Sequence, residues 1–143
     1  MKKKTKKVIF LKGKRIYLRP FEENDITENY QQHLNNLHEF GILIRFPKNK
    51  LELKKYFKDH NKNDHSLFFT ICDLKNNNNI GTASLSSINW IDRNAMYGRL
   101  IFKEFRSCGY GTECMKLIKK YAFNYLNLNS LWTKMYSVNK ASI

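Results

Sequence analysis

Residues 15–21 alternate between apolar and polar side chains and stop at a proline, a pattern that predicts a first β-strand. Further strands are predicted over residues 66–74, 80–88, 95–102 and 130–138. Four consecutive asparagines at positions 76–79 separate two of these segments and predict a hairpin turn. These segments therefore predict one sheet with at least one hairpin.

Three helices are predicted between these strands. Asn24 or Asp25 can cap a helix over residues 26–37. Asn49 followed by Glu52 resembles a capping box and opens a second helix to about residue 58. The clearest helix has one face at helical spacing, formed by Gly111, Cys114, Met115, Ile118, Tyr121, Ala122 and Tyr125. The order β-α-α-β-β-β-α-β predicts an α/β (α+β) fold with a mixed, mostly antiparallel sheet flanked by helices.

Composition limits the classes that this chain can belong to. Its 143 residues fit one domain, and 42% hydrophobic residues can form a core. No apolar stretch is long enough to span a bilayer, so no membrane association is expected. Much of the net charge of +14 comes from residues 1–15, which hold eight basic residues and no acid. We expect a basic flexible tail over residues 1–10 and a single domain over residues 11–143, without specific nucleic-acid binding.

Cysteine and histidine usage bears on location and metals. The chain has three cysteines, an odd number, and no C-x-x-C motif, so we expect no disulfide framework. We therefore expect a cytoplasmic location. Two histidine pairs, His33/His38 and His60/His65, have i, i+5 spacing, which does not put two ligands on one helical face. No metal site is expected.

The segment R-S-C-G-Y-G-T at residues 106–112 lies between a predicted strand and the clearest helix. Gly109 and Gly111 let the backbone approach a ligand closely, and the N–H groups here meet the positive end of the helix dipole. Arg106 adds a positive charge. A pyrophosphate fits such a cradle, although a turn that merely starts the helix remains the alternative. The segment does not match the Rossmann fingerprint, because Cys114 occupies the position of the third glycine, and the sequence contains no Walker motif.

Together with this segment, other motifs make the chain resemble the GNAT superfamily of acetyl-CoA-dependent N-acetyltransferases. The resemblance is to the branch that includes ribosomal-protein, spermidine and amino-sugar acetyltransferases, and it runs from Leu11 onward. The residues that carry it are L-R-P-F at 18–21 with Asp25, I-N-W at 88–90, R-N-A at 93–95, Y-A-F at 121–123, L-N-L at 126–128 and N-K-A-S-I at 139–143.

The resemblance implies acetyl-CoA as co-substrate and a set of residues that bind it. Backbone groups of Arg99, Leu100 and Ile101 would pair with the pantetheine arm. Asn139 would contact the cofactor near the thioester. The pyrophosphate would be held by Arg106, Ser107, Cys108, Gly109, Tyr110, Gly111 and Thr112.

The implied reaction is direct transfer of the acetyl group to a primary amine of a small molecule. An amino sugar or sugar nucleotide is favoured, because residues 93–101 resemble that group. A cationic polyamine calls for carboxylates, of which the chain has only 12 against 26 basic residues. A non-catalytic acyl-CoA-binding module, or acetylation of a protein N-terminus or a polyamine, stays open.

No catalytic residue is assigned. Many relatives carry a glutamate where this chain has Met96. Asp92, Glu104 and Tyr97 are weaker candidates for a base. The family also continues past the N-x-A-x motif with a helix and two strands, so the resemblance implies either a C-terminally truncated domain or a remnant of one. An open sheet edge there allows a homodimer.

Overall fold

The computed structural model describes residues 8–35, 49–60 and 64–133. In these ranges six strands form one sheet whose spatial order follows the sequence: β1 (Leu11–Lys12), β2 (Ile16–Pro20), β3 (Leu67–Asp73), β4 (Asn79–Asn89), β5 (Asn94–Ile101) and β6 (Ser130–Trp132). Neighbouring strands are antiparallel except β5 and β6, which are parallel. The predicted mixed, mostly antiparallel sheet is confirmed.

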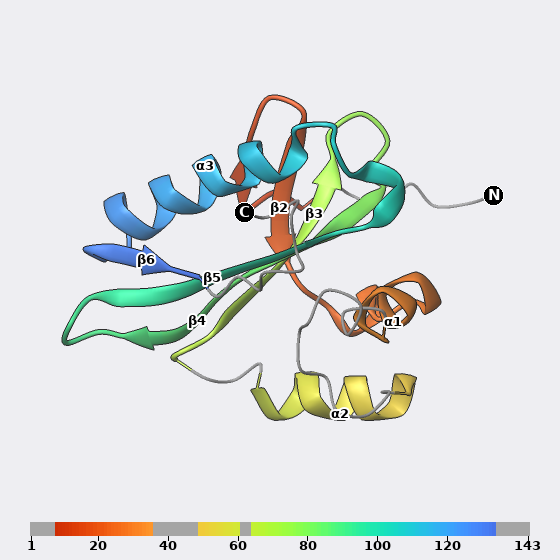
Figure 1. Ribbon diagram of the computed structural model, residues 1–143, viewed down its shortest axis with the longest axis horizontal. Coiled ribbons are helices and arrows are strands. Elements are labelled where there is room, and N and C mark those ends of the chain that lie inside the picture. Colours follow the sequence, from red (N-terminus) through yellow and green to blue (C-terminus); the bar gives the residue numbers. More distant parts are fainter. Residues whose placement is uncertain (1–7, 36–48, 61–63, 134–143) are drawn as a thin grey trace.

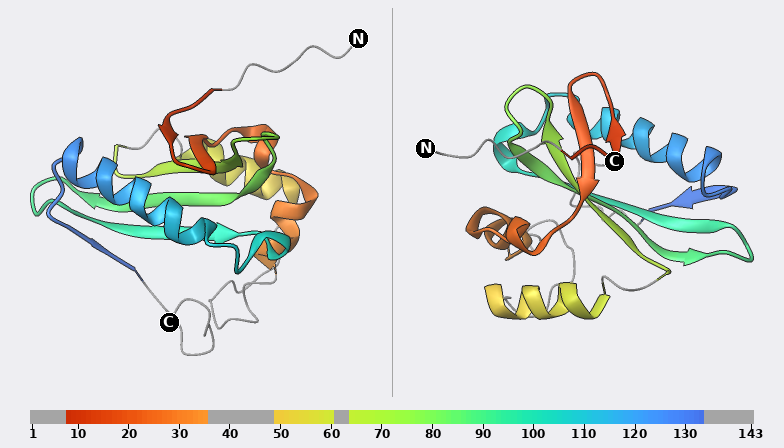
Figure 2. Two further views of the ribbon diagram at one scale, coloured as in Figure 1. Left: turned by 90° about the horizontal axis from the view of Figure 1, so that it is seen from above. Right: turned by 180° about the vertical axis from the view of Figure 1, so that it is seen from behind.

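Helices cover both faces of this sheet (Figures 1 and 2). Helix α3 (Tyr110–Asn124) lies across one face, while α1 (Glu28–Asn35) and α2 (Lys50–His60) lie on the other. Two short 3-10 helices, η1 (Glu23–Asp25) and η3 (Lys103–Phe105), precede α1 and α3. The predicted α/β class is confirmed, and no helix in the described ranges is long and apolar enough to cross a membrane.

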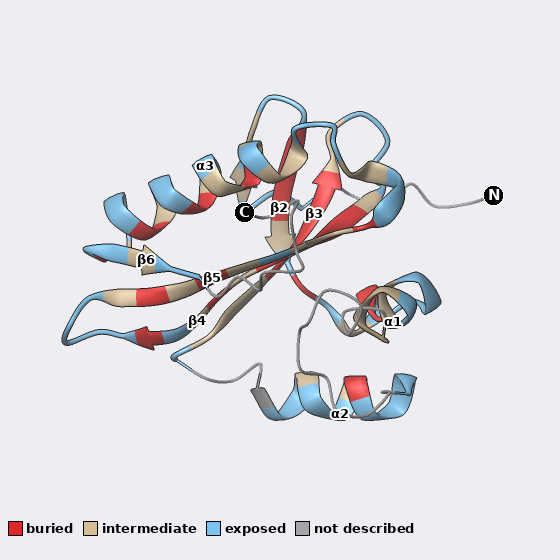
Figure 3. Cartoon of the chain, in the orientation of Figure 1, coloured by how far each residue is buried: buried red, intermediate tan, exposed pale blue. Residues whose placement is uncertain are grey.

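The alternation of side chains along the strands divides the interior into two cores (Figure 3). The larger core packs Ile16, Ile71 and their neighbours against Ile118 on the sheet-facing side of α3. The smaller core joins Phe21, Ile26 and Leu53 on the side of α1 and α2. Both faces of the sheet are therefore occupied, and the strands carry apolar side chains on both.

The start of α1 differs from the prediction. Neither Asn24 nor Asp25 caps it; instead the amide of Tyr30 donates to the Thr27 hydroxyl oxygen at 3.2 Å. The Asp25 side chain turns inward, where both its oxygens accept hydrogen bonds from the Arg19 guanidinium at 2.6 and 2.8 Å. A buried carboxylate must be paired, and this requirement outweighs helix capping. The second cap is confirmed, since the Glu52 amide donates to Asn49 Oδ1 at 2.8 Å.

The sheet begins earlier than predicted, with the two-residue strand β1, which is too short to leave a sequence pattern. Phe10, the last residue of the predicted tail, also packs on the sheet. Its amide donates to the Leu18 carbonyl at 2.8 Å, and its ring lies 5.7 Å from that of Phe69 and 5.2 Å from that of Tyr121. Residues 1–7 lie outside the described part of the chain.

Candidate functional site

Strand β5 has one edge that is only partly paired. It pairs with β6 at Asn94, Ala95 and Met96, and the described residues place no strand beside this edge farther along. Arg99, Leu100 and Ile101 lie on that farther stretch, with β4 on their other side. Unpaired N–H and C=O groups along a strand edge can bond to another extended chain. The residues that sequence analysis assigns to the pantetheine arm are thus at an open edge.

The chain leaves β5, passes through η3 and enters α3 through residues 106–112. Gly109 is the residue that caps α3, and its φ of 83° lies in the left-handed region that favours glycine. The first helical bond joins the Glu113 amide to the Gly109 carbonyl at 3.2 Å, and no described side chain caps this end. The amides of Tyr110, Gly111 and Thr112 therefore precede the first helical hydrogen bond, at the positive end of the helix dipole.

Two arginines brace this segment. Arg99 Nη1 donates to the Gly111 carbonyl at 3.1 Å, and Arg106 Nε donates to the Ile101 carbonyl at 3.0 Å. A Cβ atom on Gly111 would lie only 2.8 Å from Arg99 Cζ, so a larger residue there would displace the guanidinium from this position. Arg106, Ser107, Cys108, Gly109, Tyr110, Gly111 and Thr112 are thus brought together with the open edge of β5. Asn139 lies outside the described residues.

A third arginine, Arg15, was missed as a neighbour of this segment. Its Nη1 donates to the Cys108 carbonyl at 2.8 Å, and its Cζ lies 4.7 Å from the centre of the Tyr110 ring. A Cβ on Gly109 would meet Arg15 Nη2 at 2.9 Å. Sequence analysis counted Arg15 with the basic N-terminal residues, because no local pattern links positions so far apart in the chain.

Glu113, in the first turn of α3, holds Arg15 in place. Its Oε2 accepts from the amides of Arg15 and Ile16 at 2.9 and 3.0 Å, and its Oε1 from Arg15 Nε at 3.3 Å. Burial alone would raise the pKa of Glu113, but the two amides and the guanidinium outweigh it and hold the pKa below the ordinary 4.5. The carboxylate therefore stays charged and pins β2 to α3.

Replacing Glu113 with glutamine is expected to cost about 1 kcal/mol of unfolding free energy at pH 7, because a charged acceptor is lost. A carboxyl with a lowered folded-state pKa stabilises the fold above its unfolded pKa, and this stability is lost as the pH falls through the folded value. Denaturant titrations between pH 7 and pH 3 should therefore bring the two proteins together below about pH 4.5. A constant gap across that range would contradict the role given to Glu113.

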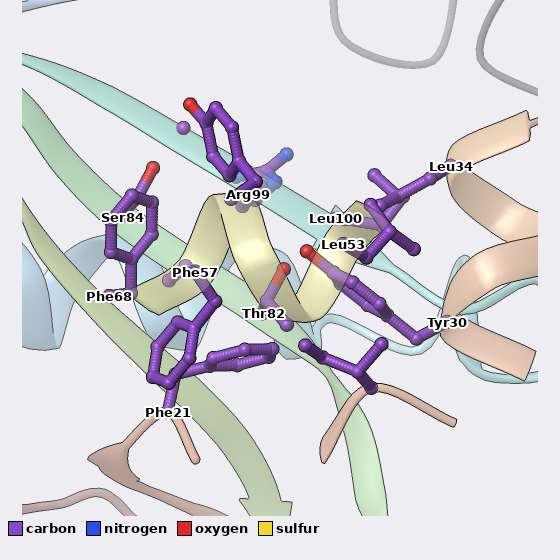
Figure 4. Close-up of a pocket in the computed structure, with 14 residues that line it drawn as sticks. Phe21, Tyr30, Leu34, Leu53, Phe57, Phe68, Thr82, Ser84, Arg99 and Leu100 are labelled. Carbon is purple, nitrogen blue, oxygen red and sulfur yellow. The ribbon is translucent and has the colours of Figure 1, made fainter. Parts of the chain in front are cut away.

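An aromatic cavity of about 220 Å³ opens on the other face of the sheet, under α1 and α2 (Figure 4). Its lining includes Gly98, Arg99 and Leu100 of β5, the stretch that also has the open edge. Five rings line it: Phe21, Tyr30, Tyr56, Phe57 and Phe68. Besides the two tyrosines, the polar lining side chains are those of Thr82 and Ser84, because the Arg99 guanidinium lies against Gly111 of α3; no carboxylate is among the described lining residues.

None of the three weaker base candidates lines this cavity. Tyr97 is 6% exposed and points to α3, where its hydroxyl donates to Cys114 Sγ at 3.7 Å; burial raises its pKa. Asp92 accepts from Asn89 Nδ2 in the β4–β5 turn. Glu104 accepts from a side chain on α1. The described residues also contain no group of three His, Cys, Asp or Glu side chains that could hold a metal ion.

Comparison with known proteins bears on the family and the fold. Residues 15–143 match the family model of the acetyltransferase (GNAT) domain. No curated protein sequence matches the chain.

Solved structures with the same fold include the spermidine N-acetyltransferase of Vibrio cholerae in complex with CoA and spermine. It has a TM-score of 0.74 and 24% identity over 83% of this chain and 70% of that chain. The spermidine/spermine N-acetyltransferase SpeG of the same organism, in complex with manganese ions, has a TM-score of 0.70 and 23% identity over 90% of this chain and 72% of that chain. The family match covers most of the sequence and confirms the predicted enzyme class. The chain belongs to the GNAT family of acetyl-CoA-dependent N-acetyltransferases.

Proposed function

We propose that the chain binds acetyl-CoA along the open edge of β5 and acetylates a primary amine held in the aromatic cavity. The observation that carries this proposal is the N-terminus of α3, which no described side chain caps and which the chain reaches through η3 from the strand that lines the cavity. The fit is supported by Gly109 and Gly111, since a Cβ at either position would meet an arginine within 3 Å. The amides of residues 109–112 would bind the pyrophosphate, as helix N-termini commonly do.

Three groups of residues would then share the binding of acetyl-CoA. The backbone of Arg99, Leu100 and Ile101 would pair with the pantetheine arm at the strand edge. Arg106, fixed by its bond to the Ile101 carbonyl, would add positive charge beside the pyrophosphate. Ser107 and Cys108 would shape the turn before Gly109, with Ser107 at a φ of 62°. By family resemblance, Asn139 would contact the cofactor near the thioester.

The cavity favours an alkyl amine, such as a polyamine, over the amino sugar preferred from sequence. Aromatic faces attract an ammonium group and pack against methylene groups. A sugar nucleotide would bury many hydroxyl and phosphate oxygens, and the polar lining side chains, Tyr30, Tyr56, Thr82 and Ser84, are too few to partner them all. The similar solved structures belong to spermidine N-acetyltransferases, which also supports the polyamine alternative.

The described residues of the cavity act mainly by positioning and by excluding water. Burial raises the pKa of Tyr30 to about 12, so this tyrosine stays protonated and is no base at neutral pH. Desolvation at the reacting nitrogen would shift that one amine toward its neutral, nucleophilic form, whereas the other ammonium groups of a polyamine would stay charged against the ring faces. The rest of the rate acceleration would come from holding that amine against β5, beside the edge where the thioester would lie.

An amine panel tests this proposal. The protein is incubated with acetyl-CoA and spermidine, glucosamine or a uridine-diphosphate amino sugar; free CoA thiol is measured and products are identified by mass spectrometry. We expect spermidine to be turned over at least about tenfold faster than either sugar, a difference of about 1.4 kcal/mol. Phe57→Leu should raise the KM for spermidine, whereas Phe123→Leu, on the exposed side of α3, should not.

Other outcomes would point elsewhere. Preferential turnover of a sugar would return the acceptor to the amino-sugar hypothesis. Binding of CoA without acetylation of any amine would favour the non-catalytic acyl-CoA-binding module.

A further inference from the structure

The entry to the coenzyme-binding segment is held by a residue of α1. Helix η3 starts at Lys103, immediately after the buried Phe102, and no side chain caps it from its own N-terminal residue. The Lys103 amide instead donates to Nε2 of His33 at 2.8 Å. The imidazole thus serves as an acceptor for the first orphan amide of a helix that belongs to another part of the chain.

Both ring nitrogens of His33 are engaged, which fixes one neutral form. Nδ1 lies 2.8 Å from the Asn29 carbonyl, and a carbonyl can only accept, so Nδ1 carries the hydrogen. Nε2 is then free of hydrogen and can accept from Lys103. The side chain is 11% exposed and its ring lies 4.8 Å from that of Phe102. The imidazole is therefore held firmly and cannot exchange partners without cost.

Helix η3, whose first amide His33 accepts, leads directly into residues 106–112. The Phe105 amide donates to the Phe102 carbonyl at 2.9 Å, and the Arg106 amide to the Lys103 carbonyl at 3.3 Å. These bonds form η3, and Arg106 follows it at once. A shift of Lys103 would displace Arg106 and, beyond it, Gly109.

A second contact from α1 also holds η3. Asn29, one turn before His33, donates from Nδ2 to Glu104 Oε1 at 3.0 Å. Tyr30 and Leu34, also four residues apart, line the aromatic cavity instead. One face of α1 thus contacts the segment before the pyrophosphate site, and the adjacent face contacts the acceptor cavity.

We propose that His33 is a positioning residue for coenzyme binding: by accepting from the Lys103 amide, it sets the register in which residues 103–106 deliver Arg106 and Gly109 to the pyrophosphate. This inference rests on the proposed function, because it assumes that CoA binds at residues 106–112. His33 itself touches no substrate.

The test compares CoA dissociation constants, measured by calorimetry, for the parent protein, His33→Leu and His33→Gln. Leucine and glutamine both favour helix, so α1 itself is not weakened. Leucine removes the acceptor, and we expect the dissociation constant to rise about tenfold, as when a buried amide loses its partner. The glutamine side chain can place an oxygen near the position of Nε2, and we expect it to bind CoA within about threefold of the parent.

A matched control is His65→Leu, which removes an imidazole bonded to the Ile88 carbonyl at the far end of β4 and should leave CoA affinity unchanged. Amide hydrogen exchange on the same proteins should show faster exchange at Lys103 in His33→Leu only. A folded His33→Leu protein with parental CoA affinity would overturn the inference and leave the proposed function intact. Failure of the parent to bind CoA would overturn both.

Discussion

Replacing Gly109 with valine is expected to weaken CoA binding at least about a hundredfold, the equivalent of about 2.8 kcal/mol. Gly109 has a φ of 83°, and a β-branched residue is a strong outlier there. A Cβ atom would also lie 2.9 Å from Arg15 Nη2. The loop must therefore rearrange, and the amides of residues 109–112 lose their common direction. Calorimetric titration of CoA into both proteins measures the effect.

The matched control is Asn127→Gly, after the C-terminal end of α3 and outside residues 106–112. Asn127 has a φ of 57°, so glycine relaxes that position and should leave CoA affinity within about twofold of the parent. Equal affinities of Gly109→Val and parent, with both proteins folded, would rule out this loop as the coenzyme site.

Replacing Asp25 with alanine is expected to lower the free energy of unfolding by about 3–5 kcal/mol. Asp25 is 5% exposed and accepts two hydrogen bonds from the Arg19 guanidinium. Its Oδ2 also accepts from the buried Thr70 hydroxyl at 2.8 Å and from the Glu22 amide at 2.8 Å. Removing the carboxylate leaves a cation and a hydroxyl without their partner inside the protein. Urea denaturation followed by circular dichroism measures the loss.

The control for this change is Asp92→Ala in the exposed β4–β5 turn, which should cost under about 1 kcal/mol. Asp25→Asn should fall between the two, because it keeps the shape and one acceptor oxygen but not the charge. If Asp25→Ala were as stable as Asp92→Ala, the pair with Arg19 would not hold β2 to η1.

Local patterns are enough to predict most of the sheet and helix α3, whose N-terminus is the proposed coenzyme site. The apolar face of α3 repeats at helical spacing, and Cys114, Ile118 and Ala122 from it are buried. The loop before it was recognised because two glycines and an arginine lie within six positions, so the whole signal is contiguous. The family motifs added the class of reaction.

The acceptor cavity could not be predicted, because its lining comes from segments that are far apart in sequence. Phe57 on α2 and Phe68 on β3 meet only when both helices cover the sheet. The same holds for Arg15 beside Cys108 and for His33 beside Lys103. Asp25 looked like a helix cap because its partner in the ion pair, Arg19, is recognisable only once η1 folds back on β2.

The most direct test of the central claim is an amide NMR titration of the ¹⁵N-labelled protein with CoA. The account predicts saturable shifts at Gly109, Tyr110, Gly111 and Thr112, with smaller ones along the β5 edge at residues 99–101. Shifts confined to other parts of the chain, or none at millimolar CoA in a folded protein, would contradict it.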